Sequence, residues 1–202
     1  MPVPFVGLTG SIGAGKSTAL AALGRLGAAT LSADAVVDEL YWTEAVQTAL
    51  RLRWGERVFS DPRTGAGQQV DKQAVARLVF NSADERTWLQ GLLWPLTAQR
   101  TREFHQAIDA RTPPPRAGVV EVPLLFEAGG EGRFDATITI VADDALRAQR
   151  LAVREQAELA ARERLQLSQS EKAARATFAV VNDGSVEELE RKLAEILDTL
   201  AA

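Results

Sequence analysis

A glycine-rich segment between an apolar run and a helical run constrains the fold of this chain more than any other feature. The segment from Gly10 to Thr18 reads Gly-Ser-Ile-Gly-Ala-Gly-Lys-Ser-Thr and matches the pattern Gly-x4-Gly-Lys-[Ser/Thr] of a phosphate-binding P-loop. Residues 4–8 before it read as a short buried strand, and residues 17–26 after it carry leucines at helical spacing. A strand, a glycine loop and a helix in this order predict a loop that binds phosphate groups.

The residue types in the loop suit the phosphates of a nucleoside triphosphate. Glycines let successive backbone N–H groups curl around phosphate oxygens, and the positive end of the following helix points at the same oxygens. A glycine-rich turn that binds nothing is the alternative. We expect Lys16 to reach the β- and γ-phosphates and the Ser17 hydroxyl to hold Mg²⁺. The loop residues expected to bind ATP are Gly10, Ser11, Ile12, Gly13, Ala14, Gly15, Lys16, Ser17 and Thr18.

Four further apolar runs read as strands, and the segments between them read as helices. The runs cover residues 28–32, 117–122, 137–141 and 178–181. Residues 186–200 carry leucine or isoleucine on one face and read as a closing helix. Strands that alternate with helices predict an α/β fold of the P-loop NTPase type, with a parallel five-stranded sheet and helices on both of its faces.

The long helical stretch after the second run predicts an insertion into this core. We expect a single nucleotide-kinase-like domain whose core takes about residues 1–34, 116–142 and 176–202. A helical acceptor-binding insertion would take about residues 35–112, and a lid about residues 143–175. All four tryptophans lie in the insertion. They form either a small core of its own or a face for a large acceptor, and the core is favoured for most of them because aromatic side chains mainly supply buried area.

Composition and charge argue against several classes of protein. A net charge of −4 argues against a broad nucleic-acid-binding surface. The chain has no cysteine and one histidine, His105, which excludes disulfides, thiolate metal sites and multi-histidine metal sites. No apolar run has the length of a membrane span, and the N-terminus does not read as a signal peptide. We expect a cytoplasmic protein that binds neither nucleic acid nor membranes, with no prediction of its oligomeric state.

Two further features favour a small kinase over a nucleotide-controlled regulator, which stays the alternative. Asp34 follows the second strand, where a carboxylate can orient an acceptor hydroxyl and take its proton; capping of a helix is the other interpretation. Residues 147–175 are rich in arginine, and we expect Arg150 and Arg154 to reach ATP. A solvated helix with ion pairs along its surface is the alternative for this stretch.

Longer motifs, in the same order along the chain, resemble the dephospho-CoA kinase family. The resemblance runs from residue 7 to residue 185 and is carried by segments 7–18, 32–34, 70–80 and 121–127, by Gln166 and Glu171-Lys172, and by Asn182-Asp-Gly-Ser. It implies ATP-dependent phosphorylation of the ribose 3′-hydroxyl of dephospho-CoA, the last step of coenzyme A synthesis. It also implies a P-loop core, a helical acceptor-binding domain and a lid.

The resemblance further implies roles for individual residues. Asp34 occupies the position of the acid that acts near the acceptor hydroxyl, and Asn182 joins the ATP site. The expected catalytic residues are thus Asp34, Lys16 and Arg154. The residues expected to bind the acceptor are Asp34, Asp71, Lys72, Pro123, Leu124, Leu125, Phe126 and Glu127. The implied cofactors are ATP and Mg²⁺, and the implied partners are the small molecules ATP and dephospho-CoA.

At five positions the chain departs from the usual pattern of that family. Ser32, Glu121 and Thr177 replace aspartates, Trp94 replaces a histidine, and Asp38 replaces a basic residue. The P-loop and Asp34 keep the pattern, so we expect phosphoryl transfer to be retained. A nucleoside or nucleotide other than dephospho-CoA is the alternative acceptor.

Overall fold

A parallel five-stranded sheet organises the larger part of the chain in the computed structural model, which describes residues 2–60, 69–151 and 166–201. The chain separates into two units. The core unit comprises residues 1–33 and 103–202 and holds the sheet, and the helical unit comprises residues 34–102.

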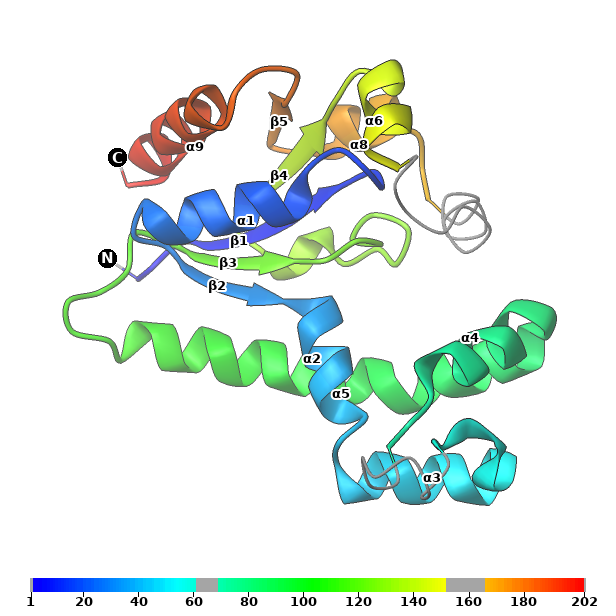
Figure 1. Ribbon diagram of the computed structural model, residues 1–202. Coiled ribbons are helices and arrows are strands. Elements are labelled where there is room, and N and C mark those ends of the chain that lie inside the picture. Colours follow the sequence, from blue (N-terminus) through cyan, green and yellow to red (C-terminus); the bar gives the residue numbers. More distant parts are fainter. Residues whose placement is uncertain (1, 61–68, 152–165, 202) are drawn as a thin grey trace. The chain divides into compact units, whose positions relative to one another are not determined.

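The strands lie in the order β2-β3-β1-β4-β5, and every neighbouring pair is parallel (Figure 1). The central strand β1 is buried along its whole length, as expected for a parallel sheet covered on both faces. This confirms the predicted α/β class and the five-stranded sheet. The strands are β1 (Phe5–Gly10), β2 (Ala29–Ser32), β3 (Gly118–Glu121), β4 (Ala136–Val141) and β5 (Phe178–Val181).

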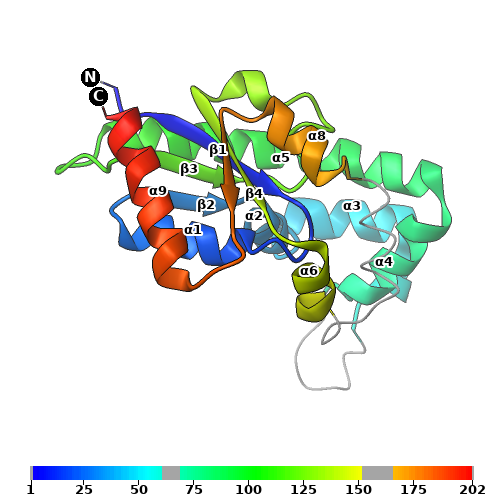
Figure 2. The ribbon, with the colours of Figure 1, turned by 90° about the horizontal axis from the view of Figure 1, so that it is seen from above.

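Two helices cover one face of the sheet. Helix α1 (Lys16–Arg25) follows the P-loop, and α9 (Val186–Leu200) closes the described chain. Buried side chains of both helices, such as Leu23 and Leu193, pack with Val6 and other apolar side chains of β1, β3, β4 and β5 in one cluster. Figure 2 shows α1 and α9 on this face and the short helix α8 (Gln169–Arg175) on the other.

The second face of the sheet carries the end of a long helix, α5 (Ala83–Asp109). Ile108 is fully buried there and packs with Phe5 of β1 and Val120 of β3. The ring of His105 stacks on the ring of Phe5 with centroids 4.0 Å apart. His105 is therefore a packing residue, and its ring contributes to the contact between α5 and the sheet.

The described residues of the helical unit, 34–60 and 69–102, form four helices and a short 3₁₀ turn, in the stretch where the sequence pattern predicts helices. Across residues 2–60, 69–151 and 166–201, no helix combines the length and the apolar character that a bilayer span requires. The elements are α2 (Ala33–Leu40), α3 (Glu44–Trp54), η1 (Gly55–Val58), α4 (Lys72–Asn81) and α5, whose last residues belong to the core unit.

Two of the four tryptophans form part of the core of the helical unit, and two do not. Trp54 is 4% exposed and packs edge-on against Trp88 at 4.9 Å, while its Nε1 donates a 2.8 Å hydrogen bond to Glu85. Trp42 and Trp94 are 60% and 53% exposed. The expectation of a core role for most of them was therefore wrong for these two. In α5, residues 88 and 94 are six positions apart, which places them on different faces of the helix.

Candidate active site

The P-loop curls between the end of β1 and the start of α1 in a shape that only glycine adopts without strain. Gly13 and Gly15 have φ values of +80° and +98°. A Cβ on Gly15 would lie 2.2 Å from Asn182 Nδ2, and one on Gly10 would lie 2.4 Å from the carbonyl oxygen of Ile140. Side chains at Gly10 and Gly15 are thus excluded both by the positive φ of the backbone and by lack of space.

The first turn of α1 is open to an anionic ligand. Gly15 stands at the N-cap in the left-handed conformation, and no side chain caps the helix there. The first intrahelical bond runs from the Ala19 N–H to the Gly15 carbonyl at 3.0 Å. The N–H groups before it have no acceptor inside the helix, and the helix dipole adds positive potential at this end. Such a helix start is suited to a phosphate group.

Two side chains from other elements hold the carbonyl groups of Gly13 and Ala14 in the P-loop. Asn182, directly after β5, donates from Nδ2 to the Ala14 carbonyl at 2.8 Å. Arg150 of α6 (Asp144–Leu151) donates from Nη1 to the carbonyls of Gly13 and Ala14, at 3.2 and 3.5 Å. The second guanidinium nitrogen, Nη2, donates to the Asn182 carbonyl at 3.2 Å. Arg150 and Asn182 thus bind the loop together, and they also bind each other.

Two further hydrogen bonds hold the loop at Ile12. Its N–H donates to Gln166 Oε1 at 3.2 Å, and its carbonyl accepts from Arg147 Nε at 3.0 Å. Arg147 is also held by Asp144, with 2.7 Å between Nη1 and Oδ1. A pocket of about 390 Å³ opens beside these contacts. It is lined by Ser11, Asp144, Arg147, Gln166, Leu167, Ser168, Gln169 and Ser170.

The two side chains of the motif that would meet the phosphates and the metal ion lie in the first turn of α1. Lys16 Nζ donates to the Ser11 carbonyl at 3.2 Å, so the ammonium group lies over the loop. Ser17 is exposed, and its hydroxyl is the kind of oxygen ligand that Mg²⁺ prefers. In the part of the chain that the structure describes, no three His, Cys, Asp or Glu side chains gather as a metal site. The Ser17 hydroxyl therefore suits a metal ion that the phosphates of a bound nucleotide would also hold.

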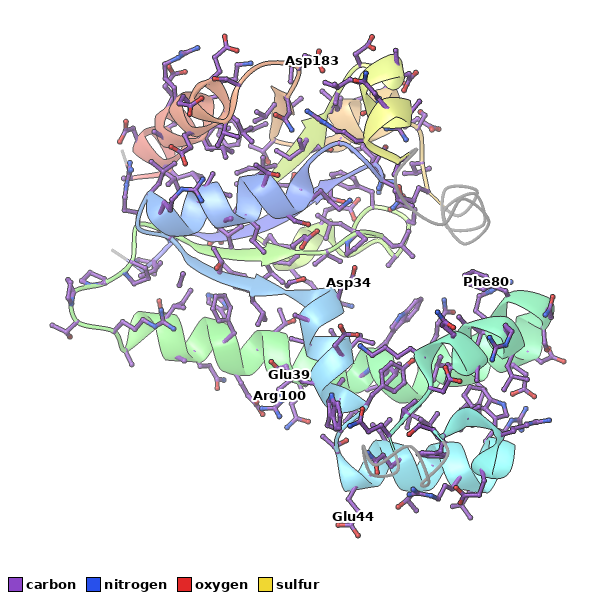
Figure 3. All side chains as sticks on the ribbon, in the orientation of Figure 1. Asp34, Glu39, Glu44, Phe80, Arg100 and Asp183 are labelled. Carbon is purple, nitrogen blue, oxygen red and sulfur yellow. The ribbon has the colours of Figure 1, made fainter. Side chains whose placement is uncertain are left out.

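Asp34 lies in the first turn of α2, which begins directly after β2 (Figure 3). The helix starts at Ala33, so Asp34 is a helical residue and does not occupy the N-cap position that the capping interpretation requires. The carboxylate is exposed. Ser32 ends β2, and its hydroxyl donates to Glu121 Oε2 at 3.1 Å.

Glu121 is a buried carboxylate to which the sequence pattern assigned no role in the site. It is 6% exposed, ends β3, and is in register with Leu8 of β1, the strand that carries the P-loop. The feature of the sequence that could have pointed to Glu121 is its position, a charged residue at the end of an apolar run. Glu121 is also one of the five departures from the family pattern, and its contact with Ser32 joins two of those departures.

The expected acceptor residues after β3 differ in how much they are exposed. Leu125 and Phe126 are 1% and 2% exposed, so their side chains serve the core. Pro123 and Leu124 are half-buried. Glu127 forms an ion pair with Lys172, at 3.0 Å between Oε1 and Nζ.

Asp71 and Lys72, the other expected acceptor residues, already have partners within the helical unit. The Asp71 carboxylate caps α4 by accepting hydrogen bonds from the N–H groups of Gln73 and Ala74, both at 3.0 Å. Lys72 pairs with Asp38 at 2.6 Å, and both side chains are about half exposed. Asp38 is a third departure from the family pattern. Arg154 lies outside the described residues.

Comparisons with protein families and curated sequences give a consistent result. A model of the dephospho-CoA kinase family matches residues 4–188. The chain is 34% identical to a dephospho-CoA kinase of Thermus thermophilus over 199 residues, which cover 97% of this chain and 91% of the relative. It is 33% identical to a dephospho-CoA kinase of Rhodopseudomonas palustris over 199 residues, or 97% of this chain and 95% of that one.

Two solved structures share the fold. A crystal structure of a Thermus thermophilus protein matches with a TM-score of 0.82 and 33% sequence identity, and the match covers 100% of both chains. Dephospho-CoA kinase from Campylobacter jejuni matches with a TM-score of 0.68 and 20% identity, over 97% of this chain and 96% of that one. At the lower identity the likeness concerns the arrangement of strands and helices alone.

Proposed function

The chain belongs to the dephospho-CoA kinase family, and from that premise we propose how its own residues carry out the transfer. It is a kinase of coenzyme A biosynthesis: the γ-phosphoryl group of ATP passes to the ribose 3′-hydroxyl of dephospho-CoA, giving coenzyme A and ADP. The proposal is carried by the P-loop itself. Arg150 and Asn182 bind its carbonyl groups, and no side chain caps the helix α1 that follows it.

The nucleotide half of the site is held in shape by contacts from other segments to the backbone of Ile12, Gly13 and Ala14. Contacts to the carbonyls of Ile12, Gly13 and Ala14 hold the loop in its curled shape, in which backbone N–H groups at the start of α1 would donate to the phosphates. Lys16 would exchange its bond to the Ser11 carbonyl for one to the β- and γ-phosphates. Preorganised donors of this kind stabilise the charge that develops on the transferred group.

The acceptor half is assigned to Asp34, with residues 71–72 and 123–127 as acceptor-binding residues. The Asp34 carboxylate would orient the ribose hydroxyl and accept its proton late in the transfer. Its exposed side chain lies in the first turn of α2, past the N-cap position, which supports this assignment. Because Leu125 and Phe126 are buried, contacts from the 123–127 segment to the acceptor would come from its backbone and from its less buried side chains.

Arg150 has a supporting role in the nucleotide site in addition to its charge. Its guanidinium joins the P-loop to the turn after β5, so we assign it to the ATP site as a residue that both shapes the loop and adds positive charge. Arg154 is assigned to the transition-state charge, as an arginine finger would act. Mg²⁺, bound by the phosphates and the Ser17 hydroxyl, would neutralise phosphate charge. The lid at about residues 143–175, the helical acceptor-binding insertion and the cytoplasmic location stay predictions.

The test measures ADP release from Mg·ATP with and without dephospho-CoA, with the mass of the product checked for one added phosphate. A panel of nucleosides and nucleotides runs alongside. ADP formed only with dephospho-CoA, together with coenzyme A, is the expected result. ADP formed only with another acceptor would make the chain a relative of changed specificity. ATP binding without turnover on any acceptor would indicate a regulator. The comparisons favour neither alternative.

A further inference from the structure

A buried lysine contacts the segment that follows β3. Lys172 of α8 is 0% exposed, and its ammonium group donates to the Pro123 carbonyl and contacts Glu127 Oε1, both at 3.0 Å. Burial lowers the pKa of Lys172 from its ordinary value of 10.5, while the hydrogen bond and the charge of Glu127 act in the opposite direction. Glu127 is itself 12% exposed, so both charges are largely removed from water.

The two acceptors of this lysine are shared with two other parts of the core unit. The Pro123 carbonyl also accepts from Thr9 Oγ1, at 3.4 Å, and Thr9 lies in β1 just before the P-loop. Glu127 Oε1 also accepts from the Leu167 N–H at 2.8 Å. The ammonium group thus binds the segment after β3, and the same two acceptor groups link that segment to β1 and to the chain at residue 167.

The stability of the fold alone does not account for a buried ammonium group at Lys172. A buried ion pair loses the hydration of both groups, and a well-packed apolar pair of the same volume is often as stable or more stable. The pair is also incompletely satisfied, since in the described ranges Glu127 Oε2 is buried without a hydrogen-bond partner. What an ammonium group offers, and an apolar side chain does not, is directional donors that fix a carbonyl and a carboxylate in place.

We propose that Lys172 is a positioning residue for the phosphoryl transfer, and that its bonds to Pro123 and Glu127 fix the segment after β3 relative to the P-loop strand. The proposal rests on the proposed function, in which residues 123–127 bind the acceptor. Lys172 touches neither substrate. It acts through the Pro123 carbonyl and the Glu127 carboxylate, which follow β3 where β3 pairs with β1.

The consequence is a separation between nucleotide binding and turnover. The P-loop carbonyls are held by Arg147, Arg150 and Asn182, none of which bonds to Lys172 in the described structure. Loss of the ammonium group should therefore leave ATP affinity intact. It should lower kcat with dephospho-CoA by roughly 10- to 100-fold, the range seen when a residue that orients a reacting group through another residue is removed.

The experiment compares Lys172→Met with wild type and with a matched control, Lys192→Met. Lys192 of α9 also donates to a backbone carbonyl of the core unit, Val181, at 2.8 Å, but at the exposed surface. ATP affinity is measured by calorimetry without acceptor, and kcat and KM for both substrates by ADP release. The expected result is a fall in kcat and a rise in KM for dephospho-CoA in Lys172→Met alone, with the calorimetric affinity for ATP unchanged.

A second variant separates positioning from stability. In Lys172→Met with Glu127→Leu, the ion pair is replaced by an apolar pair, which should restore the thermal midpoint that Lys172→Met alone loses. The positioning role predicts that kcat stays low in this double variant. Glu127→Gln is measured beside it, because Glu127 is itself assigned to acceptor binding and its own share of the loss has to be known. Recovery of kcat together with the thermal midpoint would show that the pair only stabilises the fold, and the proposal would be wrong.

The same measurements tell failure of the proposal from failure of the proposed function. Wild-type protein without acceptor-dependent turnover on dephospho-CoA contradicts the proposed function. Wild-type turnover together with an equally active Lys172→Met contradicts the positioning role alone. A lowered ATP affinity in Lys172→Met would also overturn the proposal, because the lysine would then act on the nucleotide half of the site.

Discussion

The side-chain amide of Asn182 lies 2.8 Å from the carbonyl oxygen of Ala14, and it occupies the space that a side chain on Gly15 would need. These residues are 168 positions apart in the sequence. The contact joins the turn after β5 to the P-loop, and Figure 3 shows the next residue, Asp183, in that same turn. Asp183 accepts a 2.7 Å hydrogen bond from the Asp143 N–H before α6. The turn after β5 is therefore a structural part of the nucleotide site.

Replacement of Gly15 by alanine should weaken ATP binding by on the order of 10- to 100-fold, as backbone strain of about 1–3 kcal/mol implies. The φ of +98° disfavours any side chain, and the new Cβ would lie 2.2 Å from Asn182 Nδ2. Calorimetry with ATP measures the effect. The control is Gly91→Ala within α5, where no atom lies within 4 Å of the added Cβ and about 0.5–1 kcal/mol of stability should be gained. Equal ATP affinity in both variants would contradict the assignment of the loop.

Two further substitutions should separate nucleotide binding from proton transfer. Lys16→Ala should lower both ATP affinity and turnover, because the proposed role of its ammonium group is to meet the phosphates. Asp34→Asn should lower kcat by roughly 10²- to 10⁴-fold with ATP affinity kept, the range for loss of a general base. Asp84→Asn, in the first turn of α5 as Asp34 is in that of α2, is the matched control. Near-normal turnover of Asp34→Asn would exclude the carboxylate as the base.

The two arginines assigned to ATP should differ in the kinetic constant that they change. Arg150→Ala removes donors to the carbonyls of Gly13, Ala14 and Asn182, so it should raise KM for ATP as well as lower kcat. Arg154→Ala should mainly lower kcat, by up to about 10³-fold if it acts as an arginine finger. Steady-state kinetics with varied ATP and fixed acceptor distinguish the two patterns. Unchanged kinetics in Arg154→Ala would transfer that role to another residue.

The features that could be predicted from the sequence are those fixed by local pattern. The closing helix was expected at residues 186–200, and α9 has those bounds because its Ser185 cap and its leucine stripe are both local signals. β5 was likewise expected at residues 178–181, where the structure has it. The P-loop was predictable because its conformation depends on glycines that no other residue replaces.

The support of the site could not be predicted, because it depends on contacts between distant segments. Lys172 lies in a charged stretch that reads as a solvated helix, yet the Pro123 and Glu127 contacts bury it completely. Leu125 and Phe126 belong to the motif of the resemblance, and only the fold shows that their side chains are in the core. Trp94 and Trp88 both read as candidate core residues, and only the packing of α5 distinguishes them.

Acid should destabilise the helical unit through Glu85. The hydrogen bond from Arg53, at 2.9 Å, and then that from Trp54 hold the pKa of Glu85 below its ordinary value of 4.5. A carboxylate whose folded pKa is lowered stabilises the fold above its unfolded pKa, and this contribution is lost as the pH falls through the folded pKa. Glu85→Gln should therefore reduce the loss of stability on acidification below pH 4.5. Urea unfolding across that window measures it, with Glu44→Gln at an exposed position of α3 as the control.

Truncation of the tryptophans should separate the core of the helical unit from its exposed aromatic surface. Trp54→Ala should cost about 3–5 kcal/mol of unfolding free energy, the usual range for a buried aromatic, because it removes the contact with Trp88 and the hydrogen bond to Glu85. Trp94→Ala, at a side chain that is 53% exposed, should change stability by about 0.5 kcal/mol or less. Urea denaturation followed by circular dichroism gives both values. If Trp94→Ala proved as destabilising as Trp54→Ala, the indole would have a structural partner. If its stability is unchanged, a rise in KM for dephospho-CoA in Trp94→Ala would place the exposed indole in acceptor binding, and an unchanged KM would exclude it.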